Sequence, residues 1–253
     1  MSFQKRIREK LIKLTGYWIY KQKHIPIGCD LYYDLKYRIG LPMNIVFDIG
    51  ANEGQTALPL HNYFSFSDIY CIEPVMDTYN ILTRNTSHIK KIKRFQIAFG
   101  ENNENKSILL FDNTESCMNS LNEVSMNNYE GAKNEIITIV KGDDFCLRNN
   151  IKKIDLLKID TEGYEIQVIN GFSEMIKNNQ ISAVYCEAGF NPQNVRNTYI
   201  EKIHSLMYKN NFSLYGVYEI SNWQIKTGNN YGNFLYLNNE FIKNSLLYSG
   251  FAS

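Results

Sequence analysis

The sequence predicts a doubly wound α/β fold, in which a mostly parallel sheet carries helices on both faces. Short, continuously apolar strands alternate with helical segments along most of the chain, a pattern typical of parallel strands buried on both sides. The 253 residues, of which 44% are hydrophobic and 21% charged, fit one globular domain, expected at residues 41–253. The formal net charge of +1 gives no signature of a nucleic-acid partner, so we expect none.

Residues 1–40 are expected to form a helical extension before this domain. Their first part alternates basic side chains with apolar ones at helical spacing, among them Ile7, Leu11 and Leu14. Three settings suit such an amphipathic helix: packing on the domain, peripheral contact with a membrane, or contact with a second copy in a homo-oligomer. The pattern does not choose among them.

The rest of the composition favours a cytoplasmic protein. No apolar run reaches the ~18 residues that cross a bilayer, so we expect no transmembrane segment, and no signal-peptide pattern opens the chain. The five cysteines are odd in number and contain no CxxC pair. They are interpreted as small buried hydrophobic side chains, not as a disulfide framework or a zinc site.

The alternation of apolar and polar residues gives the expected elements in order. Strands are expected at Ile45–Ile49, Ile69–Ile72, Phe95–Phe99, Ile154–Ile159, Ile181–Cys186 and Phe212–Val217, and helices at Gln55–Tyr63, Asp77–Arg84, Gly163–Lys177 and Thr198–Lys209. The Asn-rich interval 101–153 interrupts this rhythm and holds apolar pieces at 107–111 and 136–140, which predict an inserted hairpin with a loop at 115–133. Residues 233–238 suit a terminal antiparallel strand, and residues 240–248 a closing helix.

A glycine-bearing turn follows the first strand, and its spacing excludes the two commonest nucleotide motifs. It reads Asp48-Ile49-Gly50-Ala51-Asn52-Glu53-Gly54. A P-loop needs Lys-Ser/Thr after its last glycine, where this chain has Gln-Thr. The dinucleotide fingerprint needs Gly-x-Gly, where this chain has Gly-Ala-Asn.

The charges around this turn favour a cofactor without phosphate. Asp48 would repel a pyrophosphate at the helix N-terminus, and Glu53 adds a second negative charge. S-adenosylmethionine carries an ammonium and a sulfonium, which turn that repulsion into attraction. Glu73, followed by Pro74 at the end of the second strand, is placed to accept hydrogen bonds from both ribose hydroxyls. NAD binding, or a turn that only packs a strand on a helix, are the alternatives.

A second cluster of carboxylates lies at the ends of two later strands. Asp160 ends the strand at 154–159, with Glu162 two residues on, and Glu187 ends the next strand. In open α/β sheets ligands bind at the carboxyl ends of the strands, so Asp160 is expected to face the reactive methyl group. Asp160 either acts as a general base on a hydroxyl, or holds a divalent metal ion together with Glu187. Glu162 and Glu165 would also complement a helix N-terminus.

Several segments together resemble the FkbM-type methyltransferases. These segments are VFDIGANEGQTAL, CIEP, IAFG, VKGDDF and IDLLKIDTEGYEIQVINGF, in the order and approximate spacing of that family. The resemblance covers roughly Gly28 to Glu187 and implies a class I methyltransferase fold, Rossmann-like, with a mostly parallel seven-stranded sheet. It also implies a methyl transfer from S-adenosylmethionine, mostly to hydroxyl oxygens of sugars, glycans or polyketide-like products.

The resemblance implies a role for individual residues. Asp48, Gly50, Asn52 and Gly54, with Ala51 among them, would line the methionine end of the cofactor, and Glu73 and Pro74 the ribose. Ala98 would lie near the adenine, and Ser120 matches a serine-containing loop of the family only loosely. Asp160 and Glu162 would border the reaction centre, with Glu187 as the second carboxylate of the rim. By analogy with metal-dependent O-methyltransferases, Asp160 and Glu187 would hold a cation.

We therefore expect an S-adenosylmethionine-dependent O-methyltransferase that acts on a sugar hydroxyl. The sugar would be nucleotide-linked or part of a bacterial surface glycan such as a capsule or lipopolysaccharide. The alternatives are an NAD-dependent oxidoreductase and a catalytically silent binding module that keeps the fold.

Overall fold

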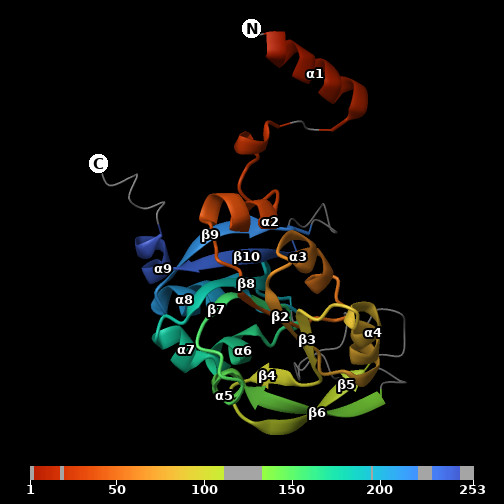
Figure 1. The fold of residues 1–253 in the computed structure, drawn as a ribbon, viewed down its shortest axis with the longest axis vertical. Helices are drawn as coiled ribbons and strands as arrows, with labels where there is room; N and C mark the ends of the chain where they lie inside the picture. The colour runs from red at the N-terminus through yellow and green to blue at the C-terminus, as the bar shows by residue number, and fades with distance from the viewer. Residues whose placement is uncertain (1–2, 18–19, 111–132, 195, 222–229, 246–253) are drawn as a thin grey trace.

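The computed structural model describes residues 3–17, 20–110, 133–194, 196–221 and 230–245. Within these ranges seven strands form one sheet in the order β3-β2-β1-β7-β8-β10-β9 (Figure 1). They are β1 (Ile45–Ile49), β2 (Asp68–Ile72), β3 (Ile92–Phe95), β7 (Ile154–Ile159), β8 (Ile181–Gly189), β9 (Phe212–Tyr218) and β10 (Tyr231–Asn238). All neighbours pair in parallel except β10, which runs antiparallel to both β8 and β9. The doubly wound sheet and its terminal antiparallel strand are confirmed.

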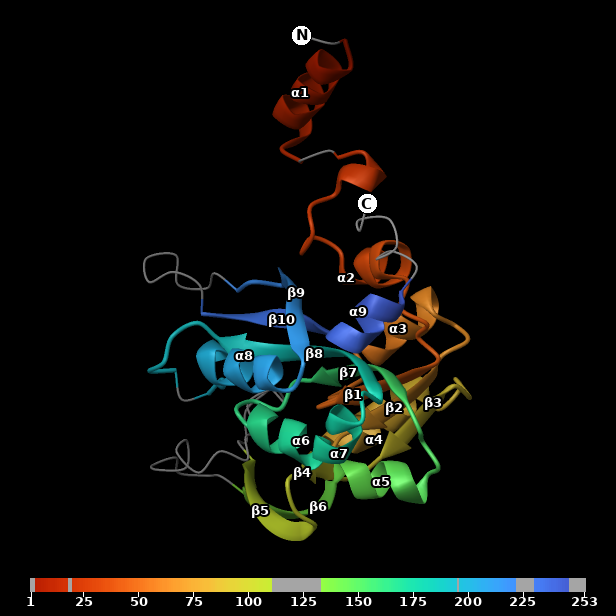
Figure 2. The ribbon, with the colours of Figure 1, turned by 90° about the vertical axis from the view of Figure 1, so that its left-hand side faces the viewer.

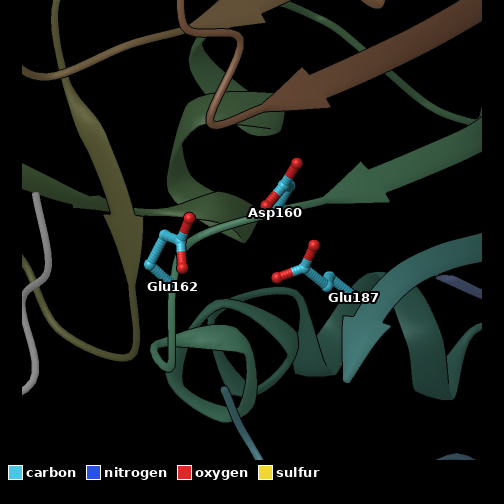
Figure 3. A group of neighbouring side chains, drawn as sticks. All are labelled: Asp160, Glu162 and Glu187. Carbon is cyan, nitrogen blue, oxygen red and sulfur yellow. The ribbon is translucent and has the colours of Figure 1, made fainter. Parts of the chain in front are cut away.

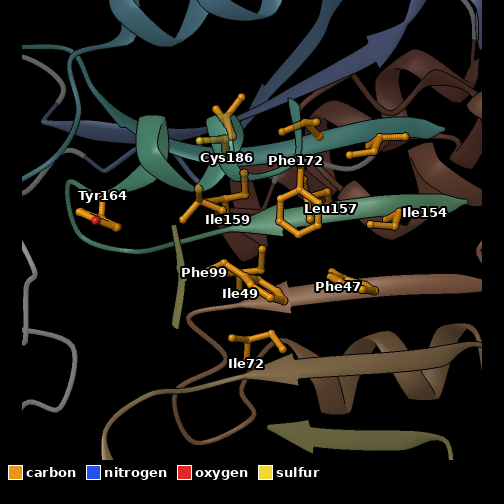
Figure 4. Close-up of a cluster of buried hydrophobic side chains, with 14 of the residues drawn as sticks. Phe47, Ile49, Ile72, Phe99, Ile154, Leu157, Ile159, Tyr164, Phe172 and Cys186 are labelled. Carbon is orange, nitrogen blue, oxygen red and sulfur yellow. The ribbon is translucent and has the colours of Figure 1, made fainter. Parts of the chain in front are cut away.

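Each face of this sheet has its own hydrophobic core, because successive strand residues point to opposite sides. Phe47 and Ile49 of β1 belong to a cluster that includes Phe99 and Phe172 (Figure 4). On this face lie α5 (Gly142–Arg148), α6 (Glu165–Gly171), α7 (Ser173–Lys177) and α8 (Ile200–Lys209). The opposite face packs against α2 (Leu31–Tyr33), η2 (Asp34–Ile39), α3 (Ala57–Tyr63) and α4 (Met76–Thr86). Helices therefore cover both faces, as predicted.

The insertion after β3 builds a second, three-stranded sheet. It has the order β4-β6-β5, with β4 (Ala98–Gly100), β5 (Glu104–Leu110) and β6 (Lys133–Lys141). The antiparallel pairing of β5 with β6 confirms the predicted hairpin. The strand predicted at Phe95–Phe99 is wrong, because the chain leaves the large sheet after Phe95 and resumes at Ala98 beside Ile139 of β6. A partner about forty residues ahead decides this break, so the local apolar run could not signal it.

The helix predicted at Gly163–Lys177 is two helices, α6 and α7, with a break at Phe172. The backbone there has φ −105° and ψ 22°, outside the helical range. The Phe172 ring is fully buried, with its centroid 5.1 Å from that of Phe99 and 6.0 Å from that of Phe47. The helix therefore breaks at the residue whose ring packs into the hydrophobic core (Figure 4).

The N-terminal helix α1 (Phe3–Thr15) stands clear of the domain in both views (Figures 1 and 2). Its apolar residues Ile7, Leu11 and Leu14 are exposed, Leu14 to 84%. Packing on the domain is therefore not what the structure shows, whereas membrane contact and oligomer contact stay predictions. A single turn, η1 (Gln22–His24), follows α1, and α9 (Asn239–Asn244) lies at the other end of the described chain. None of the described helices combines the length and apolarity needed to cross a bilayer.

The boundaries of the remaining predicted elements agree within two or three residues, while the division into an extension and a domain stays a prediction. Three of the described cysteines are buried, as expected, and Cys29 is exposed. The predicted loop at 115–133 falls almost entirely outside the described residues, as does the end of the predicted closing helix.

Candidate active site

The glycine turn after β1 is held between the second strand and the loop after β7. Gly50 has φ 73°, and a Cβ there would lie 1.8 Å from the carbonyl oxygen of Asp160. The backbone N–H groups of Gly50 and Ala51 both donate to the carbonyl of Ile72 at 3.0 Å. Only glycine fits this left-handed backbone with a neighbouring chain so close. The turn thus brings the ends of β1, β2 and β7 together.

A cavity of about 750 Å³, counted with its open mouth, lies beside this turn. We call it the turn cavity. One part of its wall is apolar and combines Ile72, Val75, Ala98, Phe99 and Ile108. The other part is polar and combines Asn52, Gln55, Glu73, Asp160, Thr161 and Glu162, with Gly50 and Pro74 also in the lining. An apolar wall opposite a few convergent polar groups is the usual form of a cofactor site.

Glu73 connects the turn to the beginning of α4 and faces the turn cavity. Its two carboxylate oxygens accept from the backbone N–H of Asn52 at 3.1 Å and of Val75 at 3.0 Å. Burial raises the pKa of Glu73 to about 7, although the two backbone donors oppose the rise. Each oxygen has a further lone pair, so the group can accept two more hydrogen bonds from a ligand diol.

Asp48 forms a buried ion pair with Lys158, its register partner on β7. The Nζ of Lys158 lies 3.0 Å from Oδ1 of Asp48 and 3.4 Å from Oδ2 of Asp160. Burial alone would lower the pKa of Lys158, but these two carboxylates outweigh burial and raise the pKa above its usual value. The sequence suggested that the negative charge of Asp48 faces the cofactor, whereas in the structure Asp48 is buried and paired with Lys158.

Asp160, Glu162 and Glu187 turn their carboxyl groups toward a common space at the rim of the sheet (Figure 3). Each places an oxygen within 4.8 Å of the others. Arg196 holds Glu162 through two hydrogen bonds, from Nε at 2.7 Å and from an Nη at 2.8 Å. The amide of Asn197 donates to Glu187. The sequence therefore placed three carboxylates in one cluster correctly, but it missed the side chains that fix them.

The pKa of Glu187 is raised to about 9. Burial is the main cause, followed by repulsion from Asp160, Glu162 and Glu165, while Lys158 opposes the rise. Such a pKa favours the protonated form of Glu187 near neutral pH. The cluster needs a proton or a cation at this position, since three adjacent carboxylates repel one another.

Glu165 organises the loop that carries these groups. It is buried at the start of α6 and accepts from the backbone N–H of Thr161 at 3.1 Å and of Gly163 at 3.0 Å, and from the hydroxyl of Thr198. Glu162 within the loop has φ 51°, a left-handed backbone that this hydrogen-bonding supports. Glu165 thus closes a turn and shapes the rim from beneath.

A second cavity opens on the other side of Asp160, and we call it the tyrosine cavity. Its lining is Leu31, Tyr32, Gln55, Thr56, Lys158, Asp160, Tyr185, Glu187, Glu219, Tyr231 and Asn233. Asp160 and Gln55 belong to both linings, so the two cavities meet at these residues. The turn cavity takes strand residues of one face of the sheet, such as Ile49 and Ile72, and the tyrosine cavity takes those of the other, such as Lys158 and Tyr185.

The predicted site residues fall into three groups by position. Gly50, Asn52, Glu73, Pro74, Ala98, Asp160 and Glu162 line the turn cavity, and Glu187 lines the tyrosine cavity with Asp160. Asp48, Ala51 and Gly54 are buried in or beneath the turn and line neither cavity. Ser120 lies outside the described residues. The roles assigned to all these residues stay predictions.

The chain also matches known proteins. Residues 48–214 match the family model described as the methyltransferase FkbM domain. The chain belongs to the FkbM methyltransferase family. This confirms the resemblance seen in the sequence and favours a methyltransferase over the oxidoreductase alternative.

Among relatives of this FkbM methyltransferase is the hexuronic acid methyltransferase AglP of Haloferax volcanii. It is 24% identical over 152 residues, which are 60% of this chain and 59% of that protein. The match thus spans less than two thirds of the relative's length.

Solved structures similar to this FkbM methyltransferase are distant. Precorrin-6y C5,15-methyltransferase from Geobacter metallireducens GS-15 has a TM-score of 0.41 and 9% identity, covering 76% of this chain and 79% of that one. The methyltransferase domain of bacterial CtHen1 has a TM-score of 0.45 and 12% identity, covering 82% and 94%. The strand order, with antiparallel β10 between β8 and β9, is that of the class I methyltransferase fold, as predicted.

Proposed function

We propose that this FkbM methyltransferase moves the methyl group of S-adenosylmethionine to a hydroxyl oxygen of a sugar. The observation that carries the proposal is the meeting of two cavities at Asp160, one on each side. A methyl donor in the turn cavity and an acceptor in the tyrosine cavity would approach each other at this carboxylate. Alignment of the two reactants is the largest contribution that such a site offers.

The lining of the turn cavity suits S-adenosylmethionine. The apolar wall around Ala98 and Phe99 suits the adenine, and Glu73 suits the ribose diol. Asp160 and Glu162 are the carboxylates nearest to the opposite end, where an ammonium and a sulfonium would be stabilised by negative charge. Bound there, the sulfonium supplies an activated methyl group.

Asp160 is the proposed general base. An alcohol is a poor nucleophile near neutral pH, so its proton must leave as the oxygen attacks. With the donor bound, the new C–O bond would form as the C–S bond breaks, the proton would pass to the Asp160 carboxylate, and S-adenosylhomocysteine would remain. Lys158, 3.4 Å from Oδ2 of Asp160, orients this carboxylate from beneath.

A divalent cation held by Asp160 and Glu187, with Glu162 as a third ligand, is a second form of the same proposal. Three oxygens within 4.8 Å of one another are a donor set that suits Mg²⁺ or Ca²⁺. The raised pKa of Glu187 also fits a site that gains from a positive charge. Such an ion would lower the pKa of the acceptor hydroxyl, so that deprotonation would depend less on the general base. Loss of activity in chelator and its return with Mg²⁺ would support this form, and full activity in chelator would refute it.

A sugar acceptor is supported by the relative that is named a hexuronic acid methyltransferase. We propose that the sugar is nucleotide-linked or belongs to a bacterial surface glycan, and that the reaction takes place in the cytoplasm. The tyrosine-rich lining of the second cavity suits stacking on a sugar ring.

Asp160→Asn tests the proposal directly. We expect methyl transfer, followed by mass spectrometry of the product, to fall by about a hundredfold or more. We expect the affinity for S-adenosylhomocysteine, measured by titration calorimetry, to stay within about threefold because the amide keeps the shape of the side chain. Asp77→Asn, in an exposed carboxylate of α4 that lines neither cavity, is the matched control. Full activity of the Asp160 variant would remove the base from this position, and absence of cofactor binding in the unaltered protein would favour a silent module.

A further inference from the structure

The tyrosine cavity has a charge distribution that limits what it can bind. Its charged lining residues are Lys158, Asp160, Glu187 and Glu219. Among the described residues that line this cavity, Lys158 is the one cation. Its Nζ already lies 3.0 Å from Oδ1 of Asp48 and 3.4 Å from Oδ2 of Asp160. This one positive charge is outnumbered even when Glu187 is protonated. The remaining carboxylates are Asp160 and Glu219 in the lining and Asp48 behind Lys158.

Glu219 is the carboxylate of this cavity farthest along the chain, at the end of β9. Its Oε2 accepts from the hydroxyl of Tyr185 at 3.2 Å and from the amide of Asn233 at 2.9 Å. Both donors are buried side chains of neighbouring strands, so they fix the position of this carboxylate. Glu219 itself is an exposed residue that lines the cavity, and its carboxylate keeps lone pairs for a ligand.

The negative field of Glu219 reaches the opposite wall. Burial raises the pKa of Tyr32 to about 12, and the carboxylate of Glu219 is the next largest cause of that rise. The ring of Tyr32 is held in place by stacking on Tyr63, with centroids 4.8 Å apart. A fixed aromatic face thus lies within the electrostatic range of a fixed carboxylate, and both line one cavity.

We propose that the tyrosine cavity is the acceptor site and that it selects an uncharged or amine-bearing sugar ring, rejecting an acidic one. This inference rests on the proposed function, since it names the substrate class of the same site. Hydroxyl or ammonium groups of the sugar donate hydrogen bonds to Glu219. The apolar face of the sugar ring lies against the tyrosine side chains of the lining. A carboxylate on the ring would meet Glu219 and Asp160 with no uncommitted cation among the described lining residues. This chain would therefore differ in acceptor from the relative named for hexuronic acid.

The test uses a neutral sugar together with an acidic and an amine-bearing sugar, each of which differs from the neutral one at a single carbon. Methyl glucoside, methyl glucuronide and methyl glucosaminide, with the galacto series alongside, are presented to the full chain loaded with S-adenosylhomocysteine. Binding is followed by saturation-transfer NMR, and cofactor binding is measured separately by calorimetry. We expect the neutral and amine-bearing sugars to bind at least about tenfold more tightly than the uronides, the size of one partly screened charge repulsion. Equal or tighter binding of a uronide, or binding of none of the sugars by the loaded protein, would overturn the inference.

One variant in the cavity and one control variant outside it test whether this cavity causes the selectivity. Glu219→Gln keeps an oxygen for Tyr185 and Asn233 but removes the charge, so the ratio of uronide to neutral affinity should rise about five- to tenfold. Glu201→Gln, in an exposed carboxylate of α8 that lines neither cavity, should leave that ratio unchanged. An unchanged ratio in the Glu219 variant would also overturn the inference. Failure of S-adenosylhomocysteine to bind would instead refute the proposed function, so the two failures are read from different measurements.

Discussion

Replacing Glu187 by glutamine should change how the stability of the protein depends on pH. Burial and the neighbouring carboxylates raise the pKa of Glu187 in the folded protein to about 9, whereas the usual value is 4.5. Below about pH 4.5 this carboxyl is protonated in both the folded and the unfolded chain, so it does not lower the free energy of unfolding. As the pH rises toward about 9, the unfolded chain releases its proton while the folded chain keeps it, and the free energy of unfolding falls.

The size of this effect has a ceiling set by the pKa. The difference between about 9 and 4.5 corresponds to about 6 kcal/mol, at about 1.4 kcal/mol per pH unit. Three carboxylates share the repulsion, and Glu187 is only partly buried, so we expect about 2–3 kcal/mol to be attributable to this group. Glutamine keeps the oxygen that accepts from Asn197 and removes the charge.

Urea unfolding at about pH 5 and about pH 9 measures this difference. The variant should gain about 2–3 kcal/mol relative to the unaltered protein on going from the lower to the higher pH. Glu201→Gln, on the exposed side of α8, should show no such gain. Parallel pH profiles for the Glu187 variant and the unaltered protein would refute the view that Glu187 is protonated by repulsion in the rim.

Three further outcomes are expected. Gly50→Ala should destabilise the fold by about 3 kcal/mol in urea unfolding because its Cβ would lie 1.8 Å from a backbone oxygen, whereas Gly40→Ala, with φ 65° and open space, should cost only about 1 kcal/mol. Lys158→Met should cost about 3–5 kcal/mol by leaving Asp48 buried and unpaired, and adding Asp48→Asn should restore part of that loss, so additive losses would contradict the ion pair. Glu73→Gln should weaken S-adenosylhomocysteine binding about tenfold and abolish its rise through about pH 7, and a calorimetric pH profile that keeps this rise would argue against Glu73 as the ribose acceptor.

The sequence predicted those parts of the fold that depend on local patterns. Apolar strands and the glycine turn were recognisable because burial on both faces and a left-handed backbone leave their marks on consecutive residues. The division between β3 and β4 was not recognisable from the sequence, because Ala98 of β4 pairs with Ile139 of β6, at the far end of the insertion. The break at Phe172 was not recognisable either, because no helix-breaking residue marks it. The residue at the break has a buried aromatic ring instead.

In the candidate site the same distinction holds. Carboxylates at strand ends identified Asp160 and Glu187, and the same rule would have identified Glu219 at the end of β9. Arg196 left no signal, because a loop residue reaches Glu162 only through the folded chain.

Lys158 was the residue with the clearest unused signal, and it changes how the site is understood. It stands two positions before Asp160 on β7, and strand residues two apart share a face, so a lysine there must lie beneath the rim. Its burial makes sense only with compensating charge, which Asp48 supplies from the neighbouring strand. Asp48 is therefore linked to Asp160 through Lys158, the cation that contacts both carboxylates, and it lines neither cavity itself. The acidic residue of the glycine turn and the proposed base are thus two ends of one buried arrangement at the point where the strand order reverses.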